Sequence, residues 1–388
     1  MDLLFYSISI ITIIILVMYV RMIVNYVIKW NSIESFEIKN HASSFKTTVS
    51  IIVAARNEEG NIIDLLQCIA SQNYPNSLFE IYVVDDHSED KTTGVVDKFI
   101  AQNVSVQIKL IQLQKINPEL KNKKAAIQQG IEQSTGELII TTDADCIMNE
   151  NWLATIVSYY ELHKPQMIVC PVILSGESFF EKLQRLEFLS LIGITASSIK
   201  AGKPLMCNGA NLAYTRKIFF ETGGFENNTL MATGDDTFLM FNIWKLNNHH
   251  IHFLKSNDAT VTTPAQKNIS SFLQQRARWA SKTTQYNLPH VSLTGYFITA
   301  INFMILILLA LSFFKLKFLL LLFSLFSIKL IVDGNYLFKV ASYFKQKQLN
   351  SLLLLLITAM LYPFYILYIS LKSQRGHYQW KGRIFAKK

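Results

Sequence analysis

Hydrophobic and polar positions follow two different patterns along the chain. Residues 3–20 carry no charged side chain and apolar character continues to Ile28, which is long enough for a helix that crosses a bilayer. Residues 29–293 contain no comparable run. Three more apolar blocks follow, each near the ~20 residues that a spanning helix needs: 294–314, 317–337 and 351–371. The pattern predicts an N-terminal membrane anchor, a polar middle section and an apolar C-terminal region. A signal peptide or buried soluble helices are weaker interpretations.

Within the middle section, β-branched runs alternate with helical spacing. Strands are predicted at 47–54, 80–84, 106–112 and 138–142. Helical spacing is found from Ile62 to Ile69, at 91–102 and at 121–133. Strands that alternate with helices predict a parallel α/β sheet, and such sheets bind ligands beyond the carboxyl ends of their strands.

Polar clusters follow three of these strands, at 55–59, 85–90 and 143–145. Asp143 and Asp145 are spaced i, i+2, which in an extended segment puts both carboxylates on one side of the backbone. Burying two carboxylates is costly without a cation between them. A divalent ion that keeps several waters and binds phosphate oxygens suits this arrangement. A solvated turn is the alternative for an Asp-x-Asp taken alone.

The charge pattern favours a membrane surface. The net charge is +9, and Lys and Arg gather beside the apolar blocks, at Arg21, Lys29 and 372–388, which fits cytoplasmic and anionic-lipid contact. No nucleic-acid-binding module is recognisable, so we expect no nucleic-acid partner. The four cysteines are scattered without a Cys-x-x-Cys pair, which favours reduced thiols in a domain that faces the cytosol.

The ordered motifs carry a family resemblance. Val53-Ala-Ala-Arg-Asn-Glu-Glu, Val84-Asp-Asp-His-Ser-Glu-Asp, Lys124-Ala-Ala and Thr142-Asp-Ala-Asp resemble glycosyltransferase family 2, which has the GT-A fold. Gly234-Asp235-Asp236 takes the place of that family's acidic pair. Gln275-Arg276-Ala277-Arg278-Trp279 matches the Gln-x-x-Arg-Trp motif of membrane-integrated members. The resemblance covers about residues 45–285 and implies an α/β GT-A (nucleotide-diphospho-sugar transferase) cytosolic domain with flanking transmembrane helices.

The resemblance implies roles for single residues in binding the donor, the metal ion and the acceptor. Asp143 and Asp145 would bind the diphosphate, with Mg²⁺ or Mn²⁺ held by Asp145 and less firmly by Asp143. Asp235-Asp236 would supply the general base. His87 stands where many members have Gly. The base and ribose of the donor would be contacted by Ala55, Arg56, Glu58 and Asp85 or Asp86, and the base or diphosphate by Lys124. The diphosphate and acceptor would be contacted by Gln275, Arg278 and Trp279.

These residue types suit sugar transfer. A departing nucleotide diphosphate gains negative charge, which a divalent ion stabilises, and the acceptor hydroxyl needs a carboxylate base. On a helix Gln275, Arg278 and Trp279 share one face at i, i+3 and i+4. The alternatives are an acidic helix N-terminus for Asp235-Asp236 and a basic amphipathic helix on lipid for 275–279. Residues 179–192 also fit an amphipathic interfacial helix, or a core helix of the soluble domain.

The sequence therefore predicts an enzyme, a metal-dependent, inverting hexosyltransferase. It would move a sugar from a nucleotide-diphospho-sugar, in particular a UDP-sugar, to a lipid or lipid-linked acceptor. One alternative is a processive synthase of a β-linked polysaccharide, against which the few polar residues of the apolar blocks argue. The other is a non-catalytic membrane scaffold. The expected partners are a nucleotide-sugar donor, a lipid or glycan acceptor and membrane lipids.

The expected location is the cytoplasmic membrane, with several spans and the catalytic domain in the cytosol. The expected domains are an anchor at 1–28, a catalytic domain at 45–285, a membrane region at 294–371 and a basic tail at 372–388. Arg21 and Lys29 place the N-terminus outside. Three further spans put the tail outside as well, whereas its basic residues favour the inside. Pro363 marks the last block as a candidate for a kinked or re-entrant segment.

Overall fold

The computed structural model divides into two compact units, which are described one at a time. It describes residues 2–38, 45–117, 119–225, 235–246, 250–283, 286, 288–374, 377–380 and 383–386. The sheet unit consists of Ile33–Ser175, Ile199–Pro264 and Gln379–Lys388. The helical unit consists of Met1–Ser32, Gly176–Ser198 and Ala265–Tyr378.

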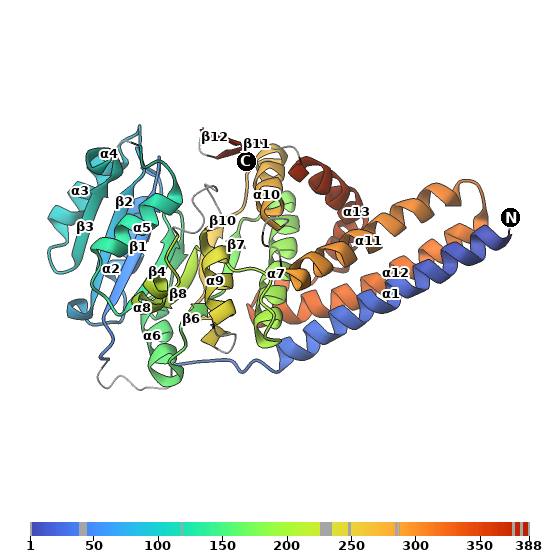
Figure 1. Cartoon of the computed structure of the whole chain (residues 1–388), viewed down its shortest axis with the longest axis horizontal. Coiled ribbons are helices and arrows are strands. Elements are labelled where there is room, and N and C mark those ends of the chain that lie inside the picture. Colours follow the sequence, from blue (N-terminus) through green and yellow to red (C-terminus); the bar gives the residue numbers. More distant parts are fainter. Residues whose placement is uncertain are drawn as a thin grey trace. The chain divides into compact units, whose positions relative to one another are not determined.

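A seven-stranded sheet of order β3-β2-β1-β4-β8-β6-β9 forms the centre of the sheet unit (Figure 1). Its first four strands are parallel, as the sequence predicts, whereas β8 is antiparallel to both of its neighbours. The strand bounds are β1 Val49–Ala55, β2 Phe79–Asp85, β3 Gln107–Gln112, β4 Leu138–Asp143, β6 Met167–Val169, β8 Asn211–Thr215 and β9 Ile251–Phe253.

Helices flank this sheet, and a small second sheet of order β5-β10-β7 completes the unit (Figure 1). The helices are α2 Ile62–Ala70, α3 Thr92–Gln102, α4 Leu113–Ile116, α5 Lys123–Gln133, α6 Trp152–His163, α8 Arg216–Glu221 and α9 Asp235–Leu246, with a short 3₁₀ turn η1 at Asn76–Leu78. The small sheet comprises β5 Ile147–Met148, β7 Val172–Ser175 and β10 Val261–Pro264. The predicted helices and strands of residues 47–142 are confirmed to within two residues at nearly every end.

Close backbone packing fixes the start of β4. A Cβ atom added to Gly136 would lie 2.5 Å from the backbone nitrogen of Ser50 in β1. The same turn holds Glu80 of β2, whose carboxylate accepts hydrogen bonds from the Ser50 hydroxyl at 2.7 Å and from the Thr135 backbone at 2.7 Å. A larger residue at 136 would push β4 away from β1, so this glycine sets the position of the strand that ends in Asp143.

Long helices make up the helical unit. They are α1 Asp2–Asn31, α7 Phe179–Lys200, α10 Ile269–Thr283, α11 Pro289–Ser312, α12 Leu316–Tyr343 and α13 Leu352–Gln374, with the turn η4 Lys347–Leu349 before α13. The last two residues of α7 belong to the sheet unit. Helices α1 and α12 run in the same direction, because Phe5 contacts Phe318 at 5.4 Å near one end and Trp30 contacts Tyr343 at 5.7 Å near the other.

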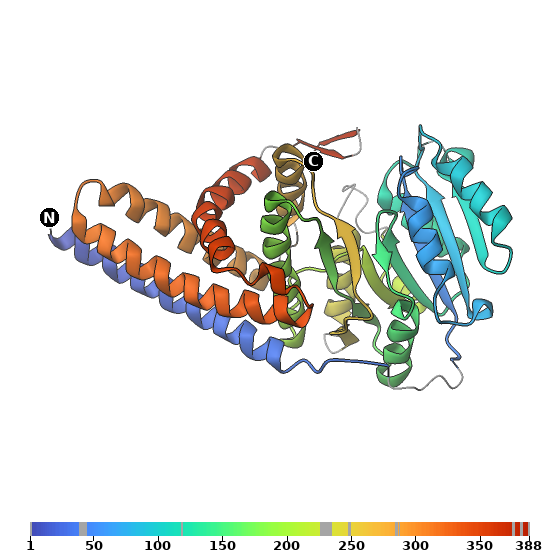
Figure 2. The same ribbon diagram turned by 180° about the vertical axis from the view of Figure 1, so that it is seen from behind.

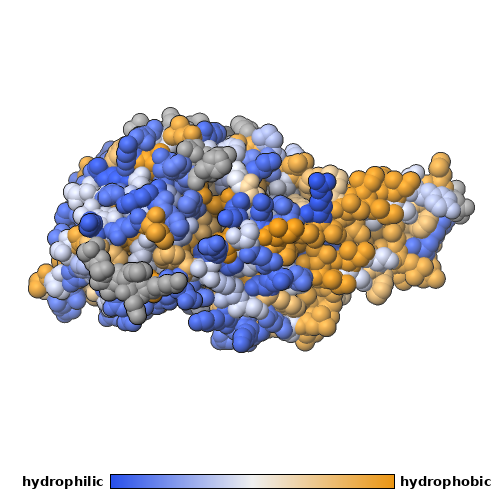
Figure 3. Space-filling model, turned by 90° about the horizontal axis from the view of Figure 1, so that it is seen from below, coloured by the Kyte–Doolittle hydropathy of each residue, from blue (hydrophilic) through white to orange (hydrophobic). Residues whose placement is uncertain are grey.

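Three helices in the described part of the chain are long and apolar enough to cross a membrane: Leu3–Asn31, Pro289–Ser312 and Leu352–Ser373. The remaining predicted block, 317–337, forms α12. Within it Lys329 and Asp333, spaced i, i+4, form an ion pair, with Lys329 Nζ 2.5 Å from Asp333 Oδ2. Apolar side chains cover the outer surface of these helices (Figure 3). Exposed members of this surface are Leu3, Ile10, Ile14, Val17, Leu320, Phe323 and Ile331.

Helix α13 takes a different course from the other apolar helices. Pro363 lies inside it, and its ribbon curves (Figures 1 and 2). Tyr365 stacks on Phe272 of α10 at 5.7 Å and donates a hydrogen bond to Glu187 of α7 at 3.3 Å. Both views show α13 beside α10, whereas α1, α11 and α12 extend together toward the N-terminal end of the chain (Figures 1 and 2). A short hairpin follows, β11 His377–Trp380 and β12 Arg383–Ala386.

Candidate active site

The polar clusters after the parallel strands lie at one edge of the sheet. The register pairs Ala55 at the end of β1 with Asp85 at the end of β2. On the other side of β1, Ala54 pairs with Asp143 at the end of β4. This edge is where ligands bind in open α/β sheets.

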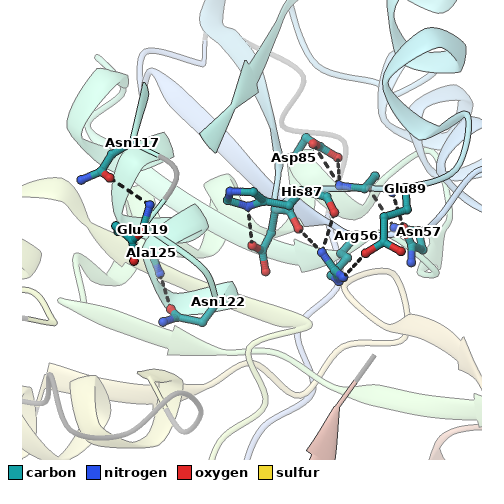
Figure 4. Close-up of polar contacts among 11 residues, drawn as sticks. Arg56, Asn57, Asp85, His87, Glu89, Asn117, Glu119, Asn122 and Ala125 are labelled. Atoms are coloured by element: carbon teal, nitrogen blue, oxygen red, sulfur yellow. Dashed lines mark hydrogen bonds and ion pairs between the residues drawn. The ribbon is translucent and has the colours of Figure 1, made fainter. Parts of the chain in front are cut away.

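Arg56 joins the first two of these loops (Figure 4). Its guanidinium donates to the carbonyls of Asp86 at 2.9 Å and His87 at 2.5 Å, and it pairs with Glu89 at 2.9 Å. Asn57 adds two bonds to the same segment, with its backbone N–H donating to Ser88 at 3.0 Å and its side chain accepting from Glu89 N at 2.8 Å. The buried charge of Arg56 therefore serves to shape the loop, which sequence reasoning did not predict.

His87 has a left-handed backbone, with φ of 59°. That conformation is unfavourable for a side chain with a Cβ and favours glycine, which gives a physical reason for the glycine at this position in the family that the sequence resembles. The His87 Nδ1 atom lies 3.2 Å from Asp86 Oδ1. Its Nε2 atom is buried with no hydrogen-bond partner among the described residues. Asp85 accepts from the backbone of Ser88 at 3.3 Å, so both acids are held by this loop.

Asp143 ends β4, and Lys123 at the start of α5 forms an ion pair with it. Asn122 caps that helix by accepting from Ala125 N at 2.8 Å (Figure 4). The neighbouring Lys124, which the resemblance assigns to the donor, is buried in the same helix turn. Lys123 is thus a charged candidate for the site that sequence reasoning missed.

Asp145 lies in a turn and not in the extended segment that the sequence predicts. The strand ends at Asp143, and Ala144 and Asp145 form a turn closed by a hydrogen bond from Cys146 N to the Asp143 carbonyl at 3.1 Å. The two carboxylates therefore do not share one face of an extended strand. Burial, followed by the negative charges of Asp143 and Asp145, raises the pKa of the Cys146 thiol well above its ordinary value.

The donor set fits a hard divalent ion that is shared with a substrate. No group of three or more His, Cys, Asp or Glu residues that could hold a metal occurs within the described ranges. Magnesium commonly takes one or two carboxylates from the protein and completes its shell with phosphate oxygens and water. Asp143 and Asp145 provide carboxylate oxygen donors of this kind, close together at the end of β4. They would hold the ion, which would stabilise charge on a departing diphosphate.

Asp236 is linked to β4 through one loop. Its Oδ2 atom accepts from Gly209 N at 2.9 Å and its Oδ1 from Thr237 N at 2.8 Å. The carbonyl of Gly209 in turn accepts from the Thr141 hydroxyl of β4 at 2.9 Å. Asp235 begins α9, but its side chain and Gly234 lie outside the described residues. Asp236 is therefore the acid of this pair whose surroundings are known.

The Gln-x-x-Arg-Trp segment lies on α10 of the helical unit. Its buried members are Arg276 and Ala277. The Arg276 guanidinium contacts Glu187 of α7 at 2.7 Å, and the sequence predicted no role for it. Arg276 also donates to Gln275 Oε1 at 2.5 Å and lies 4.4 Å from the Trp279 ring. The structure therefore gives Gln275 and Trp279 contacts with Arg276. The sequence signal that could have found Arg276 is its apolar setting beside Phe272 and Ala277.

Comparisons with known proteins place this arrangement in a family. The profile of glycosyl transferase family group 2 matches residues 138–370, which is more than half of the chain. The chain belongs to this family. The profile of glycosyl transferase family 2 also matches, at residues 50–223. The fold and the glycosyltransferase kinship that the motifs imply are thus confirmed, whereas the membrane-type role of Gln-x-x-Arg-Trp stays a prediction.

Several relatives are similar over the middle of the chain. Beta-monoglucosyldiacylglycerol synthase of Trichormus variabilis is 26% identical over 245 residues, which cover 62% of this chain and 50% of the relative. Poly-beta-1,6-N-acetyl-D-glucosamine synthase of Staphylococcus epidermidis is 25% identical over 235 residues, covering 60% of this chain and 53% of the relative. The chain thus spans about half the length of these curated relatives.

The fold also resembles a solved structure along nearly its whole length. Mannosyltransferase PcManGT from Pyrobaculum calidifontis, solved in complex with GDP-Man and Mn²⁺, aligns with a TM-score of 0.62 and 16% identity. The alignment covers 95% of this chain and 97% of the mannosyltransferase. At this identity the likeness establishes the shared fold alone.

Proposed function

We propose that this chain is a membrane-bound, inverting glycosyltransferase that moves a sugar from a nucleotide-diphospho-sugar, in particular a UDP-sugar, to a lipid or lipid-linked acceptor. The observation that carries the proposal is the alignment of Asp85 and Asp143 at one sheet edge. Asp236 is tethered to the same strand through Gly209. Family membership supplies the reaction class.

Each residue of the sheet edge has a role in this proposal. Ala55, Glu58 and the loop that Arg56 holds would line the base and ribose, with Asp85 or Asp86 as polar contacts. Asp143 and Asp145 would hold Mg²⁺ or Mn²⁺ against the diphosphate; the ion stabilises the charge of the leaving group. Lys123 and Lys124 would offset the remaining phosphate charge.

In this proposal Asp236 is the general base that deprotonates the acceptor hydroxyl. Two backbone N–H donors fix the position of its carboxylate, which would accept the proton of an attacking hydroxyl. Attack from the side opposite the diphosphate inverts the configuration at the sugar carbon. Gln275, Arg278 and Trp279 would meet the diphosphate and acceptor at the membrane face, and Asp235 stays a second candidate base.

The lipid acceptor is favoured over a polymer by the helical unit. Translocation of a polysaccharide needs a polar path, which spanning segments line with exposed polar residues. Asn302 in α11 is buried and donates to its own helix, at the Ile298 carbonyl, at 2.7 Å. The relative named as a glucosyldiacylglycerol synthase agrees with a lipid acceptor. The relative named as a polysaccharide synthase keeps processive synthesis as the second candidate.

The membrane arrangement is proposed on the same grounds. Cytosolic donor sugars place the sheet unit inside, with the N-terminus of α1 outside. Helix α13 curves at Pro363 and meets α10 and α7 through Tyr365. We infer that α13 returns to the cytosolic side without crossing, which keeps the basic residues after Lys372 inside, as their charge favours.

Release of the nucleotide tests the proposed function. The purified full chain is incubated with a panel of UDP-sugars and GDP-mannose, with Mg²⁺ or Mn²⁺ and total membrane lipid, and free nucleotide diphosphate is measured. Asp145→Ala and Asp236→Ala should lower the release at least ~100-fold, since each removes a main source of transition-state stabilisation. Asp97→Ala, at an exposed position of α3, is the matched control. Unchanged release in both site variants contradicts the assignment.

A further inference from the structure

A cavity of about 90 Å³, mainly apolar but with several polar side chains in its lining, lies inside the helical unit. Its walls come from α1, α7, α11, α12 and α13, and one water occupies about 30 Å³ in the liquid, so it has room for a few waters or a small polar headgroup. Ionisable residues within spanning helices are expensive to bury and mark functional sites by default. The polar side chains of its lining include Tyr19, Glu187, Ser190, Lys329, Asp333 and Tyr362.

The charges around this cavity cancel. Asp333 accepts from Lys329 Nζ at 2.5 Å and from the Tyr19 hydroxyl at 2.7 Å. Glu187, the second carboxylate of the lining, is paired with the buried Arg276 at 2.7 Å. A phosphate headgroup would bring an extra negative charge beside these two carboxylates in a medium of low dielectric constant, which is strongly unfavourable. An uncharged ligand adds no such cost.

Hydrogen-bond acceptors are available to such a ligand. Pro363 has no N–H to donate to the carbonyl four residues earlier, which belongs to Ala359 of the cavity wall. The carboxylates of Asp333 and Glu187 also carry lone pairs beyond the contacts described above. A hydroxyl group donates to acceptors of this kind, whereas an ionised phosphate does not.

The depth of the cavity matches the polar boundary of one leaflet. From Leu3 to Tyr19 the helix rises about 24 Å at about 1.5 Å per residue, and a hydrocarbon core is about 30 Å thick. The exposed Arg21 follows two residues later, where a charge is best placed at the headgroup level. The cavity is thus near the level where the glycerol backbone of a lipid meets its headgroup.

We propose that this cavity binds the polar end of an uncharged, hydroxyl-bearing lipid, such as a diacylglycerol, and selects it over a lipid phosphate. The inference rests on the proposed function in that it names the class of the lipid acceptor. Tyr19, Lys329 and Asp333 form the recognising cluster, and Ala359 leaves the space that the headgroup fills.

Direct lipid binding tests the inference separately from catalysis. The purified full chain in detergent is equilibrated with radiolabelled dioleoylglycerol, with undecaprenyl phosphate as competitor, while UDP binding is followed by calorimetry. Ala359→Leu fills the cavity and should weaken dioleoylglycerol binding at least tenfold, with Ala359→Val intermediate as a smaller perturbation that preserves folding. Ala310→Leu, at an exposed position of α11, is the matched control. UDP binding should be unchanged in all three variants.

Two outcomes overturn the inference: dioleoylglycerol binding unchanged in both Ala359 variants, or undecaprenyl phosphate competing as strongly as unlabelled dioleoylglycerol. Graded loss through Val and Leu, without competition by the phosphate, supports it. If lipid binding follows this pattern but no nucleotide sugar releases its nucleotide, the cavity assignment stands and the proposed function falls.

Discussion

The ion pair between Glu187 and Arg276 should be a major contributor to the stability of the helical unit. The Glu187 carboxylate accepts from Arg276 Nε at 3.1 and 3.2 Å and from Nη2 at 2.7 Å. The side chains are only 10% and 3% exposed, respectively. Glu187→Gln keeps the shape but leaves the guanidinium buried without its counter-charge. Breaking a buried pair in this way costs about 3–5 kcal/mol.

A matched control exists in the same unit. Glu177 pairs with Arg185 at 3.0 Å, but its carboxylate is 77% exposed. Exposed pairs contribute about 0–1 kcal/mol because water and salt screen them, so Glu177→Gln should change stability little. The two variants thus differ in burial more than in the chemistry of the substitution.

Urea unfolding of the purified chain in detergent, followed by tryptophan fluorescence, measures both effects. Trp279 is a local reporter because its ring lies 4.4 Å from the Arg276 guanidinium. We expect an earlier midpoint for Glu187→Gln alone, with reduced nucleotide release since α10 loses its attachment to α7. Equal shifts for the two variants would refute the argument that burial decides the strength of these pairs.

Three further predictions concern packing, pH and topology. Gly136→Ala should destabilise the sheet unit by about 1–3 kcal/mol through overpacking against β1, measured by thermal unfolding, whereas Gly60→Ala, with no atom within 4 Å of the new Cβ, should not. Although burial raises the pKa of Glu80, hydrogen bonds from Thr135, Ser50 and Tyr82 lower it more, to below its ordinary 4.5. The ionised Glu80 therefore stabilises the folded state above pH 4.5 and loses this contribution as the pH falls below it, so Glu80→Gln should flatten the acid limb of a curve of unfolding free energy against pH. A fluorescent protein fused after Lys388 should fluoresce, because a re-entrant α13 leaves the C-terminus in the cytosol, and a cysteine at position 314 (Phe314→Cys) should react with an impermeant maleimide added outside the cell. A fusion that does not fluoresce would contradict a re-entrant α13.

The ligand-binding edge of the sheet was predictable because short apolar strands are followed directly by polar clusters that contain acids. Parallel strands place their carboxyl ends together, so three strand–acid junctions imply one site without knowledge of the register. In the structure Ala55 pairs with Asp85 and Ala54 with Asp143, so the strand ends lie level to within one residue. The hydrophobic periods of two residues for strands and 3.6 for helices show directly where these elements begin and end.

The side-chain direction and backbone conformation of single residues could not be predicted from the sequence. Adjacent helical residues point about 100° apart, so the ion pair of Lys123 with Asp143 depends on where Asn122 starts the helix. The turn at Asp145 and the left-handed His87 are likewise backbone choices that tertiary contacts impose. Residue type alone favours neither.

The same reasoning separates the members of the Gln-x-x-Arg-Trp segment. The apolar neighbours of Arg276 indicate that it is buried, but its partner Glu187 precedes it by 89 residues, so no local pattern identifies that partner. Residues two apart on a helix point about 200° apart, and burial of Arg276 therefore turns Arg278 toward the opposite side of α10. Trp279, three residues on, returns to the side of Arg276 and contacts it. Arg276 thus attaches α10 to α7 through Glu187, while the role of Arg278 at a phosphate stays a prediction.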